Sequence, residues 1–220
     1  MTLSELLPKL HYPTRAERLA DTWLHGACLV LFSLAVLTLL GLAIWQGGFG
    51  MASAVAIYAI CVITMIVCSM AYNLAENSKR KTLLRRFDHA AIFLMIAGTY
   101  TPFTTLRFEG AWAIGMTALI WSVAIIGVLG KLLLPQVSKK IWLALYIAMG
   151  WLVLAAFGPL VQGVSLAALI LLAIGGLIYT IGVPFYVLER LPFRRAIWHG
   201  FVFVAAGVHY AAVLTGVVFG

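Results

Sequence analysis

Charged residues are scarce in this chain, and that scarcity excludes a typical water-soluble domain. Asp, Glu, Lys and Arg together make up 10% of the 220 residues, whereas 64% are hydrophobic. Acidic side chains are rarer than basic ones: the chain has seven Asp and Glu and 15 Lys and Arg. A chain this apolar has almost no residues left for a soluble domain, so a membrane protein is predicted.

The sequence lacks the cysteine spacing of a disulfide-rich or zinc-knuckle protein, and its last apolar run lacks the lysine of a retinal protein. The three cysteines, Cys28, Cys61 and Cys68, are odd in number and show no CxxC spacing, which excludes a disulfide framework and a zinc knuckle. We expect them to be small packing residues. Residues 196–219 contain no lysine, which excludes a retinal protein with a Schiff base in its last helix.

The chain does contain seven long apolar runs separated by short connections. A helix needs about 20 apolar residues to cross the hydrocarbon core of a bilayer. We therefore predict an all-α fold, an integral membrane bundle of seven transmembrane helices. The predicted spans lie near residues 22–46, 51–73, 88–106, 111–134, 141–161, 165–188 and 196–219.

The basic residues predict the orientation of this bundle. Fourteen of the 15 Lys and Arg fall in alternate connections, and Arg107 alone falls in the other set. Positive charge in short loops stays in the cytoplasm, so the N-terminus is predicted to be cytoplasmic and the C-terminus outside. That orientation is opposite to the one of a G-protein-coupled receptor. The formal net charge of +8 then reflects topology and contact with anionic lipid headgroups, and it predicts no nucleic-acid partner.

One membrane domain accounts for nearly the whole chain. Residues 1–13 are predicted to form a short cytoplasmic segment, and residues 14–220 form the membrane domain. Thr14 and Glu17 have the spacing of a helix start, in which the hydroxyl of the threonine caps the amide of the glutamate. Along this first helix Glu17, Asp21 and His25 recur every four residues and so share a face.

Several polar residues fall at one level of the predicted bundle, near its cytoplasmic side. Ionisable groups inside a membrane are costly and mark candidate functional sites. A polar site reached from the cytoplasm is therefore predicted, while His209 lies about 15 Å deeper and is predicted to be a neutral structural histidine. The candidate residues of the site are His25, Ser69, Asn73, Asp88, Arg195 and His199.

Each of these residues also has a purely structural interpretation. Asp88 can cap the N-terminus of the third helix, and Ser69 can bond to the backbone of its own helix. Asn73 can end the second helix, and the side chain of Arg195 can extend to the headgroups. A shared site is favoured because four helices place polar side chains at the same depth.

Short motifs along the chain carry a family resemblance. The first helix contains ERLADTWLHG (17–26), Ser69-x3-Asn73 ends the second, and the third carries FDHAAIFLMIAGTYTPF (87–103). The later helices contain YIAMGW (146–151), GGLIY (175–179) and AIWHGFV (196–202) followed by His209. In this order the motifs resemble the bacterial hemolysin III family, relatives of the progestin and adipoQ receptors, over essentially the whole chain.

The resemblance implies a seven-helix bundle with a zinc site near the cytoplasmic surface, in a cavity suited to lipid. In ceramidase-like hydrolases of the wider superfamily, a helix-two serine, an aspartate at the start of helix three and histidines of helices two and seven hold zinc and its water. Zinc lowers the pKa of such a water to about 7. The matching positions here are Ser69, Asp88 and His199.

Two of the three expected zinc ligands are replaced in this sequence. Asn73 stands where the family has its helix-two histidine, and Arg195 where it has the first histidine of helix seven. A guanidinium cannot lose its proton to bind a metal, so we expect zinc to be absent, with His199 the only retained ligand. We predict instead that Arg195 supplies the local positive charge and pairs with Asp88.

Three functions follow from the residues and the resemblance. The first is a role in membrane lipid homeostasis or lipid sensing, through an inner-leaflet polar cavity whose zinc site is degraded. The second is hydrolysis of lipid amides of the ceramide type, with Ser69, Asp88 and His199 as catalytic residues and His25 beside them. The third is a cytolytic or channel-forming protein. Each places the protein in a bacterial plasma or inner membrane with lipids as its partners, and the sequence leaves the oligomeric state open.

Overall fold

Helices are the only regular secondary structure among the residues that the computed structural model describes, which are 11–75, 78–134, 136–188 and 190–220. No strand occurs among them. The helices are α2 (Arg15–Leu74), α3 (Ser78–Leu106), α4 (Gly110–Leu133), α5 (Lys139–Gly150), α6 (Phe157–Gly163), α7 (Leu166–Val187) and α8 (Arg194–Val213), with a 3-10 helix η1 (Leu152–Ala156) and a π-helical turn η2 (Leu214–Val218).

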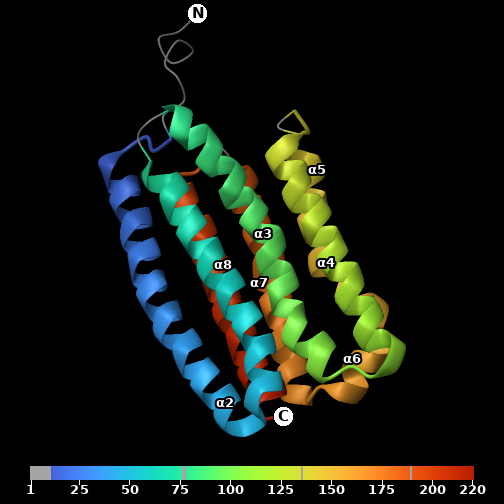
Figure 1. Ribbon diagram of the computed structural model, residues 1–220. Coiled ribbons are helices and arrows are strands. Elements are labelled where there is room, and N and C mark those ends of the chain that lie inside the picture. The colour runs from blue at the N-terminus through green and yellow to red at the C-terminus, as the bar shows by residue number, and fades with distance from the viewer. Residues whose placement is uncertain (1–10, 76–77, 135, 189) are drawn as a thin grey trace, which may run out of the picture.

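Helix α2 consists of two arms that fold back on each other at Gly48. The backbone there has φ 62° and ψ −150°, a non-helical conformation inside the helix. This region of backbone conformation is essentially restricted to glycine. Figure 1 shows the first arm (residues 15–47) descending in blue and the second arm (residues 49–74) returning in cyan. The break falls within the connection of residues 47–50 that separates the first two predicted spans.

The outer surface of the bundle is apolar, as a membrane requires. Five helical segments are long and apolar enough to cross a bilayer: 15–74, 110–133, 139–163, 166–187 and 194–218. Large apolar side chains such as Trp23, Leu37 and Phe49 are mostly exposed, which is favourable only where lipid replaces water. The prediction of an all-α, multi-pass membrane protein is confirmed. The number of spans and their orientation stay predictions.

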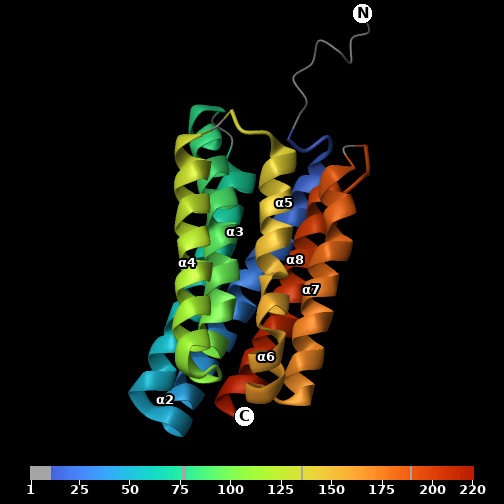
Figure 2. The same cartoon turned by 90° about the vertical axis from the view of Figure 1, so that its right-hand side faces the viewer.

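The helices run along one another in a bundle whose two ends can be told apart. Figure 1 places the starts of α2 and α8 at one end and the C-terminus at the other. The main packed pairs are α2 with α3, α3 with α4, and α7 with α8, while α2 also contacts α8. Figure 2 shows α5 and α6 following one another in a single column beside α4. The predicted span 141–161 is thus interrupted by η1, and it belongs to a column running from Lys139 to Gly163.

The second arm of α2 and α3 approach each other closely at Gly98. A Cβ atom added at Gly98 would lie 2.5 Å from the Cβ of Cys61 and 3.6 Å from the Cα of Tyr58. Cys61 and Tyr58 are both buried in this contact. The small residue therefore allows the two helices to pack at short range, as small residues do at helix interfaces in membranes.

Replacing Gly98 by alanine is expected to destabilise the protein. Overpacking a tight contact typically costs about 1–3 kcal/mol, more than the roughly 1 kcal/mol that alanine gains over glycine in a helix. Gly115→Ala on α4 is the matched control, because an added Cβ there meets no atom within 4 Å. Thermal unfolding in detergent, followed by tryptophan fluorescence, should show a lower Tm for Gly98→Ala and an unchanged or higher Tm for Gly115→Ala. Equal Tm values for the two variants would contradict the close approach.

Candidate functional site

The site begins with the local structure of the first turns of α2. Thr14 is the N-cap residue, and its side-chain oxygen accepts a hydrogen bond from the Glu17 amide at 3.2 Å. This confirms the predicted helix start. Two turns on, Asp21 and His25 lie four residues apart on one face. The Nδ1 atom of His25 lies 2.8 Å from the backbone carbonyl oxygen of Asp21 and donates to it.

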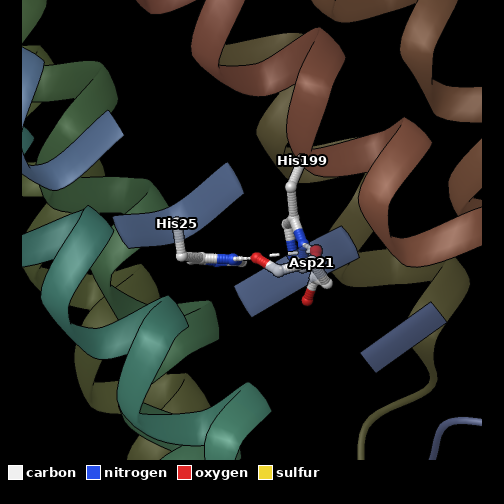
Figure 3. A group of neighbouring side chains, drawn as sticks. All are labelled: Asp21, His25 and His199. Atoms are coloured by element: carbon white, nitrogen blue, oxygen red, sulfur yellow. Dashed lines mark hydrogen bonds and ion pairs between the residues drawn. The ribbon is translucent and has the colours of Figure 1, made fainter. Parts of the chain in front are cut away.

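Asp21, His25 and His199 form a compact buried group between α2 and α8. The Nδ1 atom of His199 lies 2.6 Å from Oδ1 of Asp21, and the two imidazole ring centroids are 4.5 Å apart. All three side chains are buried. Figure 3 shows His25 and Asp21 on α2 meeting His199, which descends from α8. One potential metal-ligand atom from each residue lies within 4.8 Å of the other two. We name this group the Asp–His cluster.

Two residues of the second arm of α2 extend the Asp–His cluster. The Oγ atom of Ser69 lies 3.0 Å from Nε2 of His25. Because Nδ1 of His25 donates to a carbonyl oxygen, Nε2 is unprotonated and accepts the serine proton. The Nδ2 atom of Asn73 donates to the Ser69 carbonyl oxygen at 2.9 Å and approaches Ser69 Oγ at 3.3 Å. Ser69 therefore connects the imidazole of His25 to the amide of Asn73.

The two residues His11 and Tyr12, which we call the cap, lie over this network. The Tyr12 hydroxyl donates to Oδ2 of Asp21, the carboxylate oxygen that His199 leaves free. The Nε2 atom of His11 lies 2.9 Å from Oδ1 of Asn73 and donates to it. Arg195 holds the cap from α8, because its Nε donates to the His11 carbonyl oxygen at 2.9 Å and its guanidinium lies 5.8 Å from the centre of the Tyr12 ring.

Burial keeps both cap side chains neutral at pH 7. It lowers the pKa of His11 to about 3, and the nearby charge of Arg195 adds to this effect. For Tyr12, burial and then the negative charge of Asp21 raise the pKa well above its usual range. Neutral His11 can donate one proton to Asn73, and protonated Tyr12 can donate to Asp21. The protonation states thus agree with the observed hydrogen bonds.

The structure brings most of the predicted site residues together. His25, Ser69, Asn73 and His199 belong to one hydrogen-bonded network. Asp88 on α3 lies beside it, with Ser69 as a hydrogen-bonding neighbour and with His199 and Arg195 as charged neighbours. His209 lies apart, with Nε2 3.3 Å from the Leu172 carbonyl oxygen, in keeping with a structural histidine.

The predicted direct pair between Arg195 and Asp88 is wrong. Among the described residues, the ion pairs within 4 Å that involve Asp21 join it to His25 and to His199, and Arg195 forms none with Asp88. The reason is that the guanidinium of Arg195 is held by the cap, through the His11 carbonyl oxygen and the Tyr12 ring. Arg195 therefore acts on Asp88 over a longer distance, as an electrostatic neighbour.

Sequence reasoning missed Asp21, His11 and Tyr12 as members of the site. The four-residue spacing of Asp21 and His25 was a usable signal, because it places both on one helical face. The cap gave no such signal, since docking of residues 11 and 12 depends on tertiary contacts with Asn73, Asp21 and Arg195.

The residues at the implied zinc-ligand positions are engaged in other contacts. The amide of Asn73 donates through Nδ2 to Ser69 and accepts through Oδ1 from His11. The guanidinium of Arg195 is a permanent cation with no lone pair to offer. These two side chains therefore do not fit the ligand roles that the resemblance implies. The nearby donors that are suited to a metal are those of the Asp–His cluster.

Comparison with known proteins agrees with the helical bundle and its motifs. The model of a family described as haemolysin-III related matches residues 15–210. The hemolysin-3 homolog of Bacillus subtilis (strain 168) is 31% identical over 204 residues, which cover 91% of this chain and 94% of that protein. Hemolysin-3 of Bacillus cereus is 32% identical over 198 residues, 90% of each chain. The human monocyte to macrophage differentiation factor is 33% identical over 168 residues, 71% of this chain and 67% of its own length.

The cap is expected to loosen as the pH falls. The pKa of His11 is near 3 when docked and near 6.5 when free, so protonation favours the undocked state progressively below pH 6.5. The protection factors for amide hydrogen exchange of His11, Tyr12 and Thr14, which correct for the intrinsic exchange rate at each pH, should therefore fall between pH 7 and pH 4.5. His11→Gln retains a donor to Asn73 without titrating, and its corrected exchange should change less over this range. Identical pH profiles for the two proteins would exclude His11 as the group responsible.

Proposed function

This chain belongs to the haemolysin-III related family, and on that premise we propose that it acts in membrane lipid homeostasis or lipid sensing through the Asp–His cluster and its cap. In this proposal the chain crosses a bacterial plasma membrane seven times. Its N-terminus is cytoplasmic, so the Asp–His cluster lies near the inner surface.

The observation that carries this proposal is a buried carboxylate in an apolar bundle. Asp21 has no exposed surface, and it receives hydrogen bonds from His199 and Tyr12. Ionisable groups inside membrane helices are expensive and mark functional positions. The network joins the first arm of α2, the second arm, α8 and the cap, so a ligand that displaces the cap acts on three helical segments at once.

A basic pocket at the same end of the bundle supports the lipid part of the proposal. It lies between α3 and α4. At the edge of this pocket, the ammonium group of Lys131 lies 4.9 Å from the centre of the Trp142 ring. Basic pockets between helices near the cytoplasmic surface suit anionic lipid headgroups. The rings of His89, Tyr72 and His11 follow one another at 6.3 Å and 5.0 Å, and they connect this pocket to the cap. The pocket is lined by Thr82, Arg85, Arg86, His89, Lys131, Leu134 and Trp142.

Hydrolysis of a lipid amide is the second candidate function, and the geometry of Ser69 and His25 favours it. The Ser69 hydroxyl donates to Nε2 of His25 at 3.0 Å, while Nδ1 of His25 is held by the Asp21 carbonyl oxygen. A nucleophile, a base and a group that orients the base form the arrangement by which enzymes activate serine. We do not propose a pore, because no feature of the described residues supports one.

The orientation can be tested with reporter fusions. Alkaline phosphatase fused after Gly220 is expected to be active, because this enzyme folds only outside the cytoplasm. The same reporter fused after Lys81 or after Arg195 should be inactive, whereas green fluorescent protein fused after Lys81 should fluoresce. Active phosphatase at Lys81 would reverse the proposed orientation.

The lipid role can be tested by deleting the gene and complementing it. Deletion is expected to change the membrane lipid composition measured by mass spectrometry, and the wild type and His209→Ala should restore it. Asp21→Asn and His25→Ala, expressed at equal levels, should not restore it, because they break the network. Lipid profiles that are unaffected by deletion under every growth condition tested would refute the proposal.

The hydrolase alternative predicts a reaction product that can be measured with purified protein. Purified protein in vesicles containing ceramide should then release free fatty acid, and Ser69→Ala should abolish the release. Release that persists in Ser69→Ala would remove the serine from the reaction.

A further inference from the structure

We propose that Asp21, His25 and His199 bind a divalent transition-metal ion such as zinc. The donors come from the first arm of α2 and the start of α8. Of the ligand positions that the family resemblance implies, this site retains only His199. Binding of the ion is measured directly, so this inference stands apart from the lipid role.

The donor atoms are of the right kind and nearly at the right separation. Two imidazole nitrogens and one carboxylate oxygen are a common ligand set for zinc and neighbouring divalent metals. Ligand atoms about 2.1 Å from one ion lie at most about 4.2 Å apart. One donor atom from each residue lies within 4.8 Å of the other two, so the farthest pair needs to close by well under 1 Å, while the 2.6 Å pair of Asp21 and His199 needs to widen to admit an ion.

The surrounding hydrogen bonds prepare His25 for this role. Its Nδ1 donates to the Asp21 carbonyl oxygen at 2.8 Å, which leaves Nε2 as the free lone pair. Such a bond to the outer nitrogen is what fixes the tautomer and orientation of metal-ligating histidines. Ser69 now donates to Nε2, and on metal binding its hydroxyl has the Asp88 carboxylate beside it to accept the proton, while the Asn73 amide continues to donate to it at 3.3 Å.

The carboxylate of Asp21 is oriented from its other side. The Tyr12 hydroxyl donates to Oδ2, so Oδ1 is directed toward His199. At present Nδ1 of His199 carries the proton of a 2.6 Å hydrogen bond to Oδ1. An ion between these two atoms replaces that proton, and the neutral imidazole then carries its proton on Nε2.

The charges near the site favour a cation. Asp21 contributes one buried negative charge, and Asp88 supplies a second beside His199. The positive charge of Arg195 is bound to the His11 carbonyl oxygen and faces the Tyr12 ring, so it is not a ligand of the cluster. A dication buried with two carboxylates is neutralised, which is the condition for placing an ion in an apolar bundle.

Metal binding to the intact protein tests the site. Full-length protein in detergent is stripped with a chelator, incubated with zinc chloride and freed of excess ion, and its zinc content is then measured by mass spectrometry. We expect about one zinc ion for each wild-type chain, and a zinc-dependent rise in Tm. Asp21→Asn, His25→Ala and His199→Ala should each weaken binding by at least about tenfold. His209→Ala, which changes a histidine on the same helix as His199, should bind as the wild type does.

Two variants keep the test decisive. Asp21→Asn keeps the shape of the side chain and one oxygen that can accept from either His199 or Tyr12, so it is the variant expected to fold best, and its elution profile and its Tm without zinc verify this. Folded Asp21→Asn that binds zinc like the wild type would overturn the site. So would loss of binding in Asp88→Asn with full binding in Asp21→Asn, because the ion would then lie at the position found in relatives. A wild-type protein that binds none of zinc, cobalt, iron(II) or manganese would show that the group is a hydrogen-bond network alone.

Discussion

The hydrogen bond between Asp21 and His199 is the contact on which the rest of this structure depends. It joins residues 178 positions apart in the chain, and it holds the start of α8 against the first arm of α2. A carboxylate with no exposed surface is tolerable in an apolar bundle only when its oxygens are paired. His199 pairs with one oxygen and Tyr12 with the other. The docking of Tyr12 follows from where this carboxylate lies, while the backbone carbonyl oxygen of the same residue orients His25 toward Ser69.

Asn73 and Arg195, which stand at two of the ligand positions that the family resemblance implies, make other contacts around the Asp–His cluster. Asn73 holds Ser69 and His11 with its two amide atoms. Arg195 brings a positive charge, and the cap holds that charge on the outer side of the network. Family resemblance directs attention to Asp88, whereas the geometry shows Asp21 as the carboxylate in contact with His199. A position can thus match a family motif while the contact with His199 comes from a carboxylate on another helix.

Much of the fold could be predicted from the sequence, because a bilayer imposes simple requirements. Apolar runs of sufficient length located the helices, and the glycines at 47–50 located the turn within α2. The break at η1 was not predicted, since residues 152–156 are as apolar as their neighbours. In the site, the common depth of His25, Ser69, Asn73 and His199 was enough to group them. The pairing of Arg195 was mispredicted because the sequence gives the depth of a residue along a helix but not which neighbour its long side chain reaches. The docking of Tyr12 on Asp21 was not predicted because it produces no periodic pattern in the sequence.

The distance in sequence between Asp21 and His199 has a consequence for biosynthesis. The ribosome delivers the helix bearing Asp21 first and the helix bearing His199 last. At about 5–20 residues per second, the 178 residues between them take roughly 9 to 36 seconds to make. Throughout that time the carboxylate lacks the hydrogen bond from His199, and it must stay near water at the membrane surface or be sheltered by the insertion machinery. Arrival of the helix that bears His199 therefore completes the burial of Asp21, and a nascent chain that stops short carries an acid that is only partly satisfied.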